Sequence, residues 1–150
     1  MKTEKKATPG QTERNKELLR QAIQQIWNGG NFEAMEEFVS RDFVIRSYVP
    51  EEEIRGAENA KQFYKQLHQA FPDIHFTIID QVAEGDKVVT HWTASGTHGG
   101  EFRGIPPTGK RFRINAIDID RIVEGKVVEC WSNMDELGLL RQLGVIPASE

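Results

Sequence analysis

The spacing of hydrophobic positions changes near Pro72, and this change divides the chain into a helical part and a sheet part. Before Pro72, apolar residues recur three or four positions apart, which predicts helices over residues 12–27, 32–38 and 56–71. Between the last two, a β-branched and aromatic run predicts a strand over residues 42–49. The N-terminal half therefore supplies three helices and one strand.

After Pro72, hydrophobic and polar residues alternate, which is the pattern of half-buried strands. Short turns separate most of these segments, so consecutive strands are expected to be antiparallel neighbours. A short helix over residues 135–143 follows the last of them. The four predicted strands cover residues 75–82, 87–97, 110–122 and 126–134.

Helices followed by a meandering antiparallel sheet indicate an α+β fold in which the helices cover one face of the sheet. A curved antiparallel β-sheet of this kind, wrapped around the N-terminal helices, forms a cone with an open mouth. The chain is short enough to be a single domain, which we place at residues 13–147. Residues 1–12 are predicted to be a flexible tail because they are polar, and residues 148–150 form a second tail.

Composition excludes several classes of partner. The formal net charge of −4 and the scattered basic residues argue against nucleic acid, which proteins bind through clustered lysine and arginine. No apolar run approaches the roughly 20 residues of a membrane span, and no apolar segment follows the N-terminal lysines as in a secretory signal. We therefore expect a cytoplasmic protein with no membrane partner. Its single cysteine, Cys130, cannot form an internal disulfide and is predicted to be a small buried side chain.

Three common kinds of site lack their sequence motifs. The glycines near residue 100 are not followed by the Lys-Ser/Thr pair of a phosphate-binding loop. No Gly-x-Ser-x-Gly segment occurs, and no two histidines have the i, i+4 spacing that holds zinc on a helix. We therefore expect no metal and no cofactor. Acid–base chemistry by side chains that project from strands is the class that remains.

Two aspartates interrupt the apolar strand before residue 122. Strand alternation places Asp118 and Asp120 on one face and Arg121 on the other. Two alternatives stay open for Asp118: it points to water, or it faces a dry cavity, where loss of hydration would raise its pKa and make it a proton shuttle. Asp120 is expected to point to water.

Histidine is the other candidate acid–base residue. His91 and His98 are seven positions apart, so they lie on opposite strand faces unless a bulge intervenes, and at most one of them faces a cavity. Each could instead be a surface histidine or a hydrogen-bonded core histidine.

The last strand interleaves polar groups with an aromatic ring. Glu129, Trp131 and Asn133 share one face, which suits a ligand pocket with an apolar body and a few orienting groups. The alternative is that Trp131 covers the core while Glu129 pairs with Arg121 across the hairpin. Other aromatic residues could line the same pocket or simply pack in the core: Tyr48, Phe63, Tyr64, Trp92 and Phe102.

A combination of short motifs resembles the SnoaL-like polyketide cyclase and ester cyclase family. The resemblance covers about residues 13–147, and its motifs are Gly96-Thr97-His98, Gly104-Ile105-Pro106-Pro107-Thr108-Gly109-Lys110, Ile117-Asp118-Ile119-x-Arg121, Gly125-Lys126-x-Val128-Glu129-x-Trp131 and Leu139-Leu140-x-Gln142-Leu143-Gly144. It implies the cone fold shared with nuclear transport factor, scytalone dehydratase, ketosteroid isomerase and limonene epoxide hydrolase.

The resemblance also implies a reaction. Family cyclases use an aspartate as general acid and base, with a nearby histidine, to close a ring in a polyketide ester by an intramolecular aldol reaction, without metal or nucleotide. The matching residues are Asp118 and His98. The substrate that the resemblance implies is a small hydrophobic carbonyl compound or polyketide ester. Where many relatives place a histidine or asparagine toward the pocket, this chain departs from them and has Arg46 or Tyr48.

Two other functions fit the same fold. A limonene-type epoxide hydrolase needs an Asp-Arg-Asp cluster, but alternation sends Arg121 away from both aspartates, so an Arg46–Asp118 contact would be required. A noncatalytic small-ligand-binding or association module is the other alternative. In every case the open face of the sheet is a natural homodimer surface.

Overall fold

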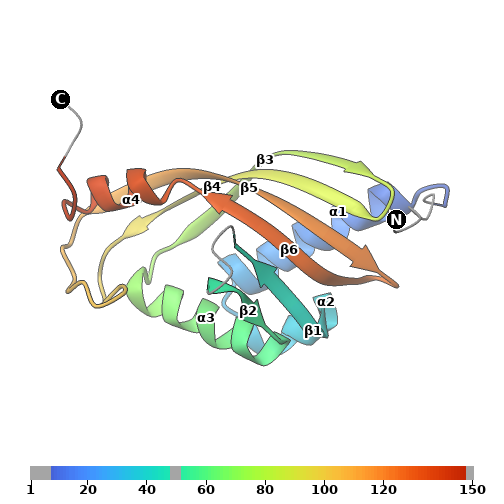
Figure 1. The fold of residues 1–150 in the computed structure, drawn as a ribbon, viewed down its shortest axis with the longest axis horizontal. Helices are drawn as coiled ribbons and strands as arrows, with labels where there is room; N and C mark the ends of the chain where they lie inside the picture. Colours follow the sequence, from blue (N-terminus) through green and yellow to red (C-terminus); the bar gives the residue numbers. More distant parts are fainter. Residues whose placement is uncertain (1–7, 48–51, 148–150) are drawn as a thin grey trace.

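The computed structural model describes residues 8–47 and 52–147. Figure 1 shows a curved, unclosed sheet that arches over the helices, which is the predicted α+β cone. One open side of the arch faces α3 (Ala57–Ala70), and α1 (Gln11–Ala22) lies under the strands at the other end. The space between sheet and helices is where a cavity can form.

The predicted helices are present, with one irregularity. The first continues past Ala22 as a π-helix, η1 (Ile23–Asn28), and a 3-10 turn, η2 (Phe32–Ala34), leads into the short helix α2 (Met35–Phe38). The C-terminal helix is α4 (Glu136–Gln142). The amide of Asn28 exchanges two hydrogen bonds with the backbone of Phe76, at 2.9 and 2.7 Å, and so fixes the π-helix to the sheet. No described helix has the length and apolarity that a membrane crossing requires.

Six strands form one sheet in the order β2-β1-β6-β5-β4-β3. The four strands after Pro72 pair as antiparallel neighbours, as predicted. The sheet departs from a pure meander because β1 pairs with β6 in parallel and because the two-residue strand β2 was not predicted. The strands are β1 (Val39–Arg46), β2 (Ile54–Arg55), β3 (His75–Glu84), β4 (Lys87–Thr97), β5 (Arg111–Val123) and β6 (Lys126–Met134).

The hairpin between β5 and β6 contains a β-bulge. Its turn uses Glu124 and Gly125, both with positive φ, which suits the right-handed twist of the two strands. The pairing then shifts from Ile122↔Val127 to Arg121↔Glu129, so Val128 is one residue too many on β6. Because side chains alternate along a strand, the extra residue exchanges the two faces of β6 beyond it.

Alternation along β5 separates the core from the outer face of the sheet. Phe112, Ile114 and Ala116 are buried on the concave face and pack with Phe71 from the end of α3. A second buried cluster joins α1, α2 and β1 with the far end of the sheet. The two clusters leave a cavity between them.

Candidate active site

A largely apolar cavity of about 480 Å³ lies between the concave face of the sheet and helix α3. This volume is within the range of small-molecule sites. Of the predicted pocket aromatics, four line it: Trp92 from β4, Phe63 and Tyr64 from α3, and Phe102 from the loop after β4. Tyr48 lies outside the described residues. The π-helix adds Trp27, whose ring meets that of Tyr64 edge to face with centroids 5.2 Å apart.

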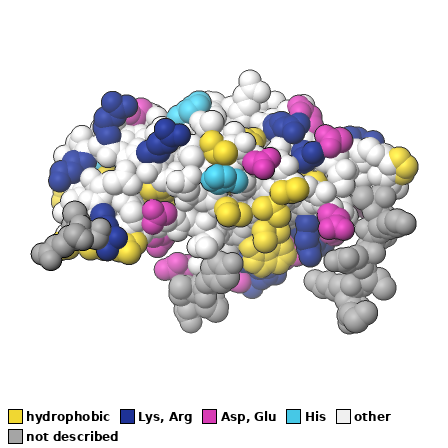
Figure 2. Space-filling model, turned by 90° about the horizontal axis from the view of Figure 1, so that it is seen from above, with side chains coloured by type: hydrophobic (Ala, Val, Ile, Leu, Met, Phe, Trp, Pro, Cys, Tyr) yellow, Lys and Arg dark blue, Asp and Glu magenta, His cyan; other side chains and the backbone are white. Residues whose placement is uncertain are grey.

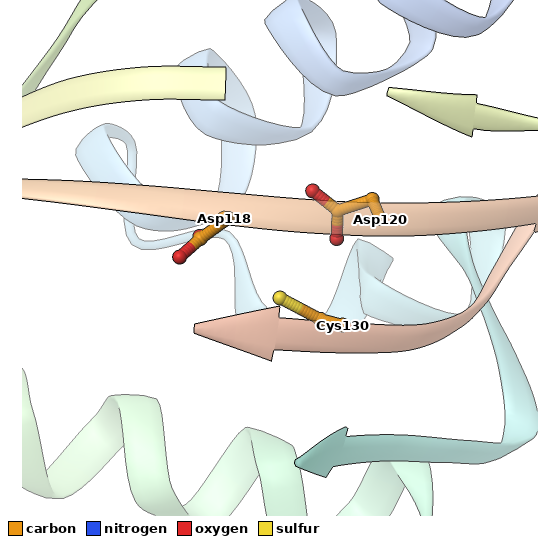
Figure 3. Close-up of side chains that lie close together, drawn as sticks. All are labelled: Asp118, Asp120 and Cys130. Carbon is orange, nitrogen blue, oxygen red and sulfur yellow. The ribbon is translucent and has the colours of Figure 1, made fainter. Parts of the chain in front are cut away.

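Polar groups gather on one wall of this cavity, at the centre of the sheet. Asp118 and Asp120 project from β5, and Cys130 projects from β6 toward them (Figure 3). The strand register pairs Asp120 with Cys130 and Asp118 with Ser132. One ligand atom from each of Asp118, Asp120 and Cys130 falls within 4.8 Å of the others. We call these three residues the carboxyl–thiol cluster.

Burial dominates the electrostatics of Asp118. Loss of hydration raises its pKa from 3.8 to about 6, although hydrogen bonds from Ser132 and Trp92 act in the opposite direction. One of its oxygens, Oδ1, is buried without a hydrogen-bond partner among the described residues. The cavity alternative for Asp118 is therefore the one the structure shows.

Asp120 is also inside, contrary to the expectation that it points to water. Its side chain is only 8% exposed because it shares the face of Asp118, and that face is the concave one. Burial raises its pKa well above the usual value, and the charge of Asp118 raises it further, while a hydrogen bond with Cys130 lowers it. Burial likewise raises the pKa of the Cys130 thiol well above its usual value. Cys130 is buried, as predicted.

The carboxyl–thiol cluster has ligand atoms close enough together for a metal ion. Metals bind deprotonated carboxylates and thiolates. Burial raises the pKa values of Asp120 and Cys130 well above their usual values and so opposes the deprotonation that a metal ion requires of its ligands. We therefore assign no metal centre to this cluster.

Two arginines near the cavity bind the same glutamate. Arg46, which lines the cavity, donates from Nε to Glu129 at 2.9 Å and from Nη1 to Glu53 at 3.3 Å. Arg121 donates from Nε to the other oxygen of Glu129 at 2.6 Å. Burial raises the pKa of Glu129, but the hydrogen bonds from both arginines outweigh this and the net shift is downward.

These contacts settle the partner of Glu129 and test the Asp-Arg-Asp cluster that an epoxide hydrolase would need. The hairpin pair Glu129–Arg121 is confirmed. Alternation along β5 does place Arg121 away from Asp118 and Asp120, as predicted, and Arg46 is bound to Glu129 and Glu53 rather than to Asp118. The described residues therefore contain no Asp-Arg-Asp cluster of the epoxide hydrolase kind.

Glu129, Trp131 and Asn133 do not line the cavity, which corrects the expected orientation of β6. The bulge at Val128 turns these three side chains to the other face of the strand. Cys130, Ser132 and Met134 take their place on the cavity wall. Sequence reasoning missed Ser132 for this reason. It also missed Thr90, although Thr90 shares the alternation of Trp92 on β4 and pairs with Asp118.

The two histidines lie on opposite sides of the sheet, as strand alternation predicted, but neither lines the cavity. His91 is on the outer face, with Nε2 3.2 Å from the side-chain oxygen of Asn115. His98 is fully buried on the inner side, behind the ring of Phe71, with ring centroids 5.6 Å apart. The expectation of a histidine beside Asp118 is not met, because Phe71 stands between His98 and the cavity.

His98 instead organises the loop between β4 and β5. Its Nδ1 accepts a hydrogen bond from the backbone N–H of Thr108 at 3.2 Å and lies 3.1 Å from the Thr108 hydroxyl. Its backbone bonds to Lys110 and Gly109. Within the same loop, positive φ angles at Arg103 and Gly104 make a tight turn that places Phe102 on the cavity wall. The loop is thus a scaffold for the rim of the cavity.

Comparison with known proteins agrees with this architecture. The family model described as SnoaL-like polyketide cyclase matches residues 17–143. The aklanonic acid methyl ester cyclase DnrD of Streptomyces peucetius is 30% identical over 130 residues, which cover 85% of this chain and 89% of DnrD.

Two solved structures are similar in fold and in sequence. AclR of Streptomyces galilaeus, a candidate hydroxylase, has a TM-score of 0.81 at 30% identity over 93% of this chain and 86% of its own. TsrD of Streptomyces laurentii has a TM-score of 0.79 at 32% identity over 89% and 97% of the two chains. The family expected from the sequence motifs is confirmed: the chain belongs to the SnoaL-like polyketide cyclase family.

Proposed function

We propose that this protein is a cofactor-independent cyclase that closes a ring in a small hydrophobic carbonyl compound, of the polyketide ester class, with Asp118 as general acid and base. The observation that carries the proposal is the placement of Asp118: a carboxyl of raised pKa on the wall of an apolar cavity. A general base works best when its pKa is near the working pH. A value of about 6 meets that condition.

The chemistry balances with this one carboxyl. The Asp118 carboxylate removes a proton from a carbon that lies between a ketone and an ester. The resulting enolate carbon attacks a second carbonyl carbon of the same molecule, a carbon–carbon bond forms, and that carbonyl oxygen becomes an alkoxide. The protonated Asp118 then returns its proton to the alkoxide. Substrate and product are isomers, so no oxidant, reductant or metal is consumed.

The cavity supports the substrate class. Its walls are mostly apolar and aromatic, which favours a flat hydrophobic body over a sugar or a nucleotide. The enclosing walls hold a flexible chain folded with its reacting carbons close together, which is a large part of the rate gain in an intramolecular reaction. DnrD is named for the methyl ester that it cyclises, and we extend the ester class to this chain.

The test is turnover of aklanonic acid methyl ester, followed by liquid chromatography and mass spectrometry. We expect a product of unchanged mass. Asp118→Asn should lower kcat by about 10² to 10⁴, the usual contribution of a general acid–base group. Asp42→Asn, an exposed aspartate on β1, is the matched control and should leave the rate unchanged.

Three outcomes would contradict the proposal. Full activity of Asp118→Asn would remove Asp118 from the mechanism. A product heavier by one oxygen atom would favour the hydroxylase activity suggested for AclR. If a panel of polyketide esters binds, as shown by quenching of tryptophan fluorescence, but none reacts, the binding-module alternative is favoured.

We also propose that the protein is a homodimer that pairs through the outer face of the sheet. Val82, Ile117 and Ile119 are 64%, 51% and 37% exposed, and the strand register places Val82, Val89, Ile119 and Trp131 in one row across four strands. Hydrophobic side chains gather in the middle of the face seen in Figure 2. A patch of this kind is rarely left in contact with water.

Light scattering at micromolar concentration should give twice the mass of one chain. Ile119→Asp places a charge in the patch and should halve the measured mass. A monomeric wild type would contradict the proposed dimer.

A further inference from the structure

The carboxyl–thiol cluster poses a charge problem that one acid–base residue does not solve. Asp118 and Asp120 lie close together in an apolar wall, Asp118 half-buried and Asp120 buried, and two carboxylates at this distance cannot both be ionised there without a cation. The titratable groups next to them are the Cys130 thiol from β6 and the Tyr64 hydroxyl from α3, and burial raises the pKa of both well above the usual value.

The cations that line the cavity are already paired. Arg46 is bound by Glu129 and Glu53, and Arg103 by Glu136 at 2.8 Å. Among the described lining residues, no further lysine or arginine is present to neutralise a second charge. The pair therefore carries one negative charge and one proton.

The surroundings of the two carboxyls differ in a way that places the proton. Asp118 receives hydrogen bonds from the Ser132 hydroxyl and the Trp92 indole, and both stabilise an anion. Among the described residues, the weak thiol donor of Cys130 is the only one that lowers the pKa of Asp120. The anion therefore belongs on Asp118 and the proton on Asp120.

We propose that Asp120 is a second catalytic residue, a neutral carboxylic acid that donates a hydrogen bond to the substrate oxygen on which negative charge develops when Asp118 removes the proton. The inference rests on the proposed function in that Asp118 is the base. A carboxylic acid held neutral by an apolar site is a strong donor for such an oxyanion. Asp120 interacts with the Cys130 thiol and also lines the cavity, where a protonated carboxyl can donate to a bound substrate. The Asp120 proton is shared with the enolate oxygen and is not transferred.

Two substitutions at position 120 separate this role from others. Asp120→Asn is neutral, has the same shape and still offers an N–H donor, so it should keep kcat within about tenfold of wild type. Asp120→Val has a similar size and a high strand propensity but no donor, so it should lose about 10² to 10³ in kcat, the usual effect of removing one oxyanion donor. Asp118→Asn should lose activity in the same assay. Circular dichroism and thermal unfolding of each variant establish that it is folded.

A measurement on the free protein tests the proton position without turnover. With aspartate labelled at Cγ with carbon-13, NMR at neutral pH should show one carboxyl resonance at the position of a protonated acid. That resonance should vanish in Asp120→Asn and persist in Asp118→Asn.

The proposal is overturned if no protonated resonance appears, if that resonance vanishes in Asp118→Asn instead, or if Asp120→Val is as active as wild type. Equal inactivity of Asp120→Asn and Asp118→Asn would also overturn it, because it would make Asp120 an ionised group. Failure of the proposed function is a different result: Asp118→Asn keeps full activity while the resonance pattern stays as described.

Discussion

Replacement of Asp118 by asparagine should make the protein more stable at neutral pH while it removes activity. The pKa of Asp118 is about 6 in the folded protein against 3.8 in the unfolded chain. Between these values the folded state holds a proton that the unfolded state has released. The free energy of unfolding therefore falls as pH rises through this window, and the stability present below 3.8 is lost above about 6.

The size of this effect follows from the two pKa values. The gap between 3.8 and about 6, at about 1.4 kcal/mol for each pKa unit, gives a loss of about 3 kcal/mol in the wild type. Asparagine cannot ionise, so the variant is spared this loss. Asp120 also keeps in the folded state a proton that the unfolded chain releases, so it adds a slope of its own to the wild type and to the variant alike, and this slope cancels in the difference between them. Any free energy that is lost because the amide fits the site less well does not depend on pH. The reasoning is therefore tested by how the difference in free energy of unfolding between variant and wild type changes with pH, and not by its absolute size.

Urea unfolding followed by tryptophan fluorescence, at a series of pH values on both sides of the window, measures this slope. We expect the variant to exceed the wild type by up to about 3 kcal/mol at neutral pH and the advantage to disappear in acid. Asp42→Asn, on the surface, serves as the control and should follow the wild type at every pH. An advantage that is constant with pH, or one that grows in acid, would refute the burial of an ionised Asp118.

Four further substitutions test the parts that surround the cavity. Glu129→Gln removes the carboxylate that Arg46 and Arg121 share, and it should cost about 1–3 kcal/mol by thermal unfolding. Because the pKa of Glu129 is lowered, this cost should shrink as pH falls below the ordinary value of 4.5, and a cost that grows in acid would contradict the pairing. His98→Ala should cost about 2–4 kcal/mol and speed amide exchange in its loop, whereas unchanged exchange would show that the ring does not hold the loop. Gly100→Ala should cost about 1–3 kcal/mol because a Cβ there would lie 2.1 Å from the backbone oxygen of Gln69. Gly99→Ala should cost less because the nearest atom to a Cβ there belongs to the Pro72 side chain, at 3.3 Å, and the reverse order would argue against the close approach at Gly100.

Sequence patterns predicted the parts of this fold that depend on local alternation. The strands after Pro72 and the long helix before it follow from spacing alone, and so does the shared face of Asp118 and Asp120. What alternation does not give is which face of β5 is concave, and that is why Asp120 was expected in water. Once one member of the pair is known to be inside, the other must be inside too.

The parts that could not be predicted depend on pairing between distant segments. No local signal marks the parallel partner of β1, because hydrogen bonds between strands leave no pattern in either sequence. The bulge at Val128 has no distinctive residue either, since a valine fits a strand with or without one. His98 follows the expected alternation, but the ring of Phe71, from the end of a helix far away in sequence, keeps it from the cavity.

The bulge makes the composition of the cavity wall depend on the pairing register of β6 as well as on its sequence. Deleting Val128 would make Val127 and Glu129 neighbours in a regular ladder, and the pairs Arg121–Glu129 and Asp120–Cys130 would both be kept, so the wall would not change. If Val128 instead entered the ladder opposite Arg121, the wall would exchange three side chains for three others: Cys130, Ser132 and Met134 for Glu129, Trp131 and Asn133. A slip of one residue in this hairpin would thus bring a charged carboxylate and an indole into the cavity together, with no change in the sequence of the strand.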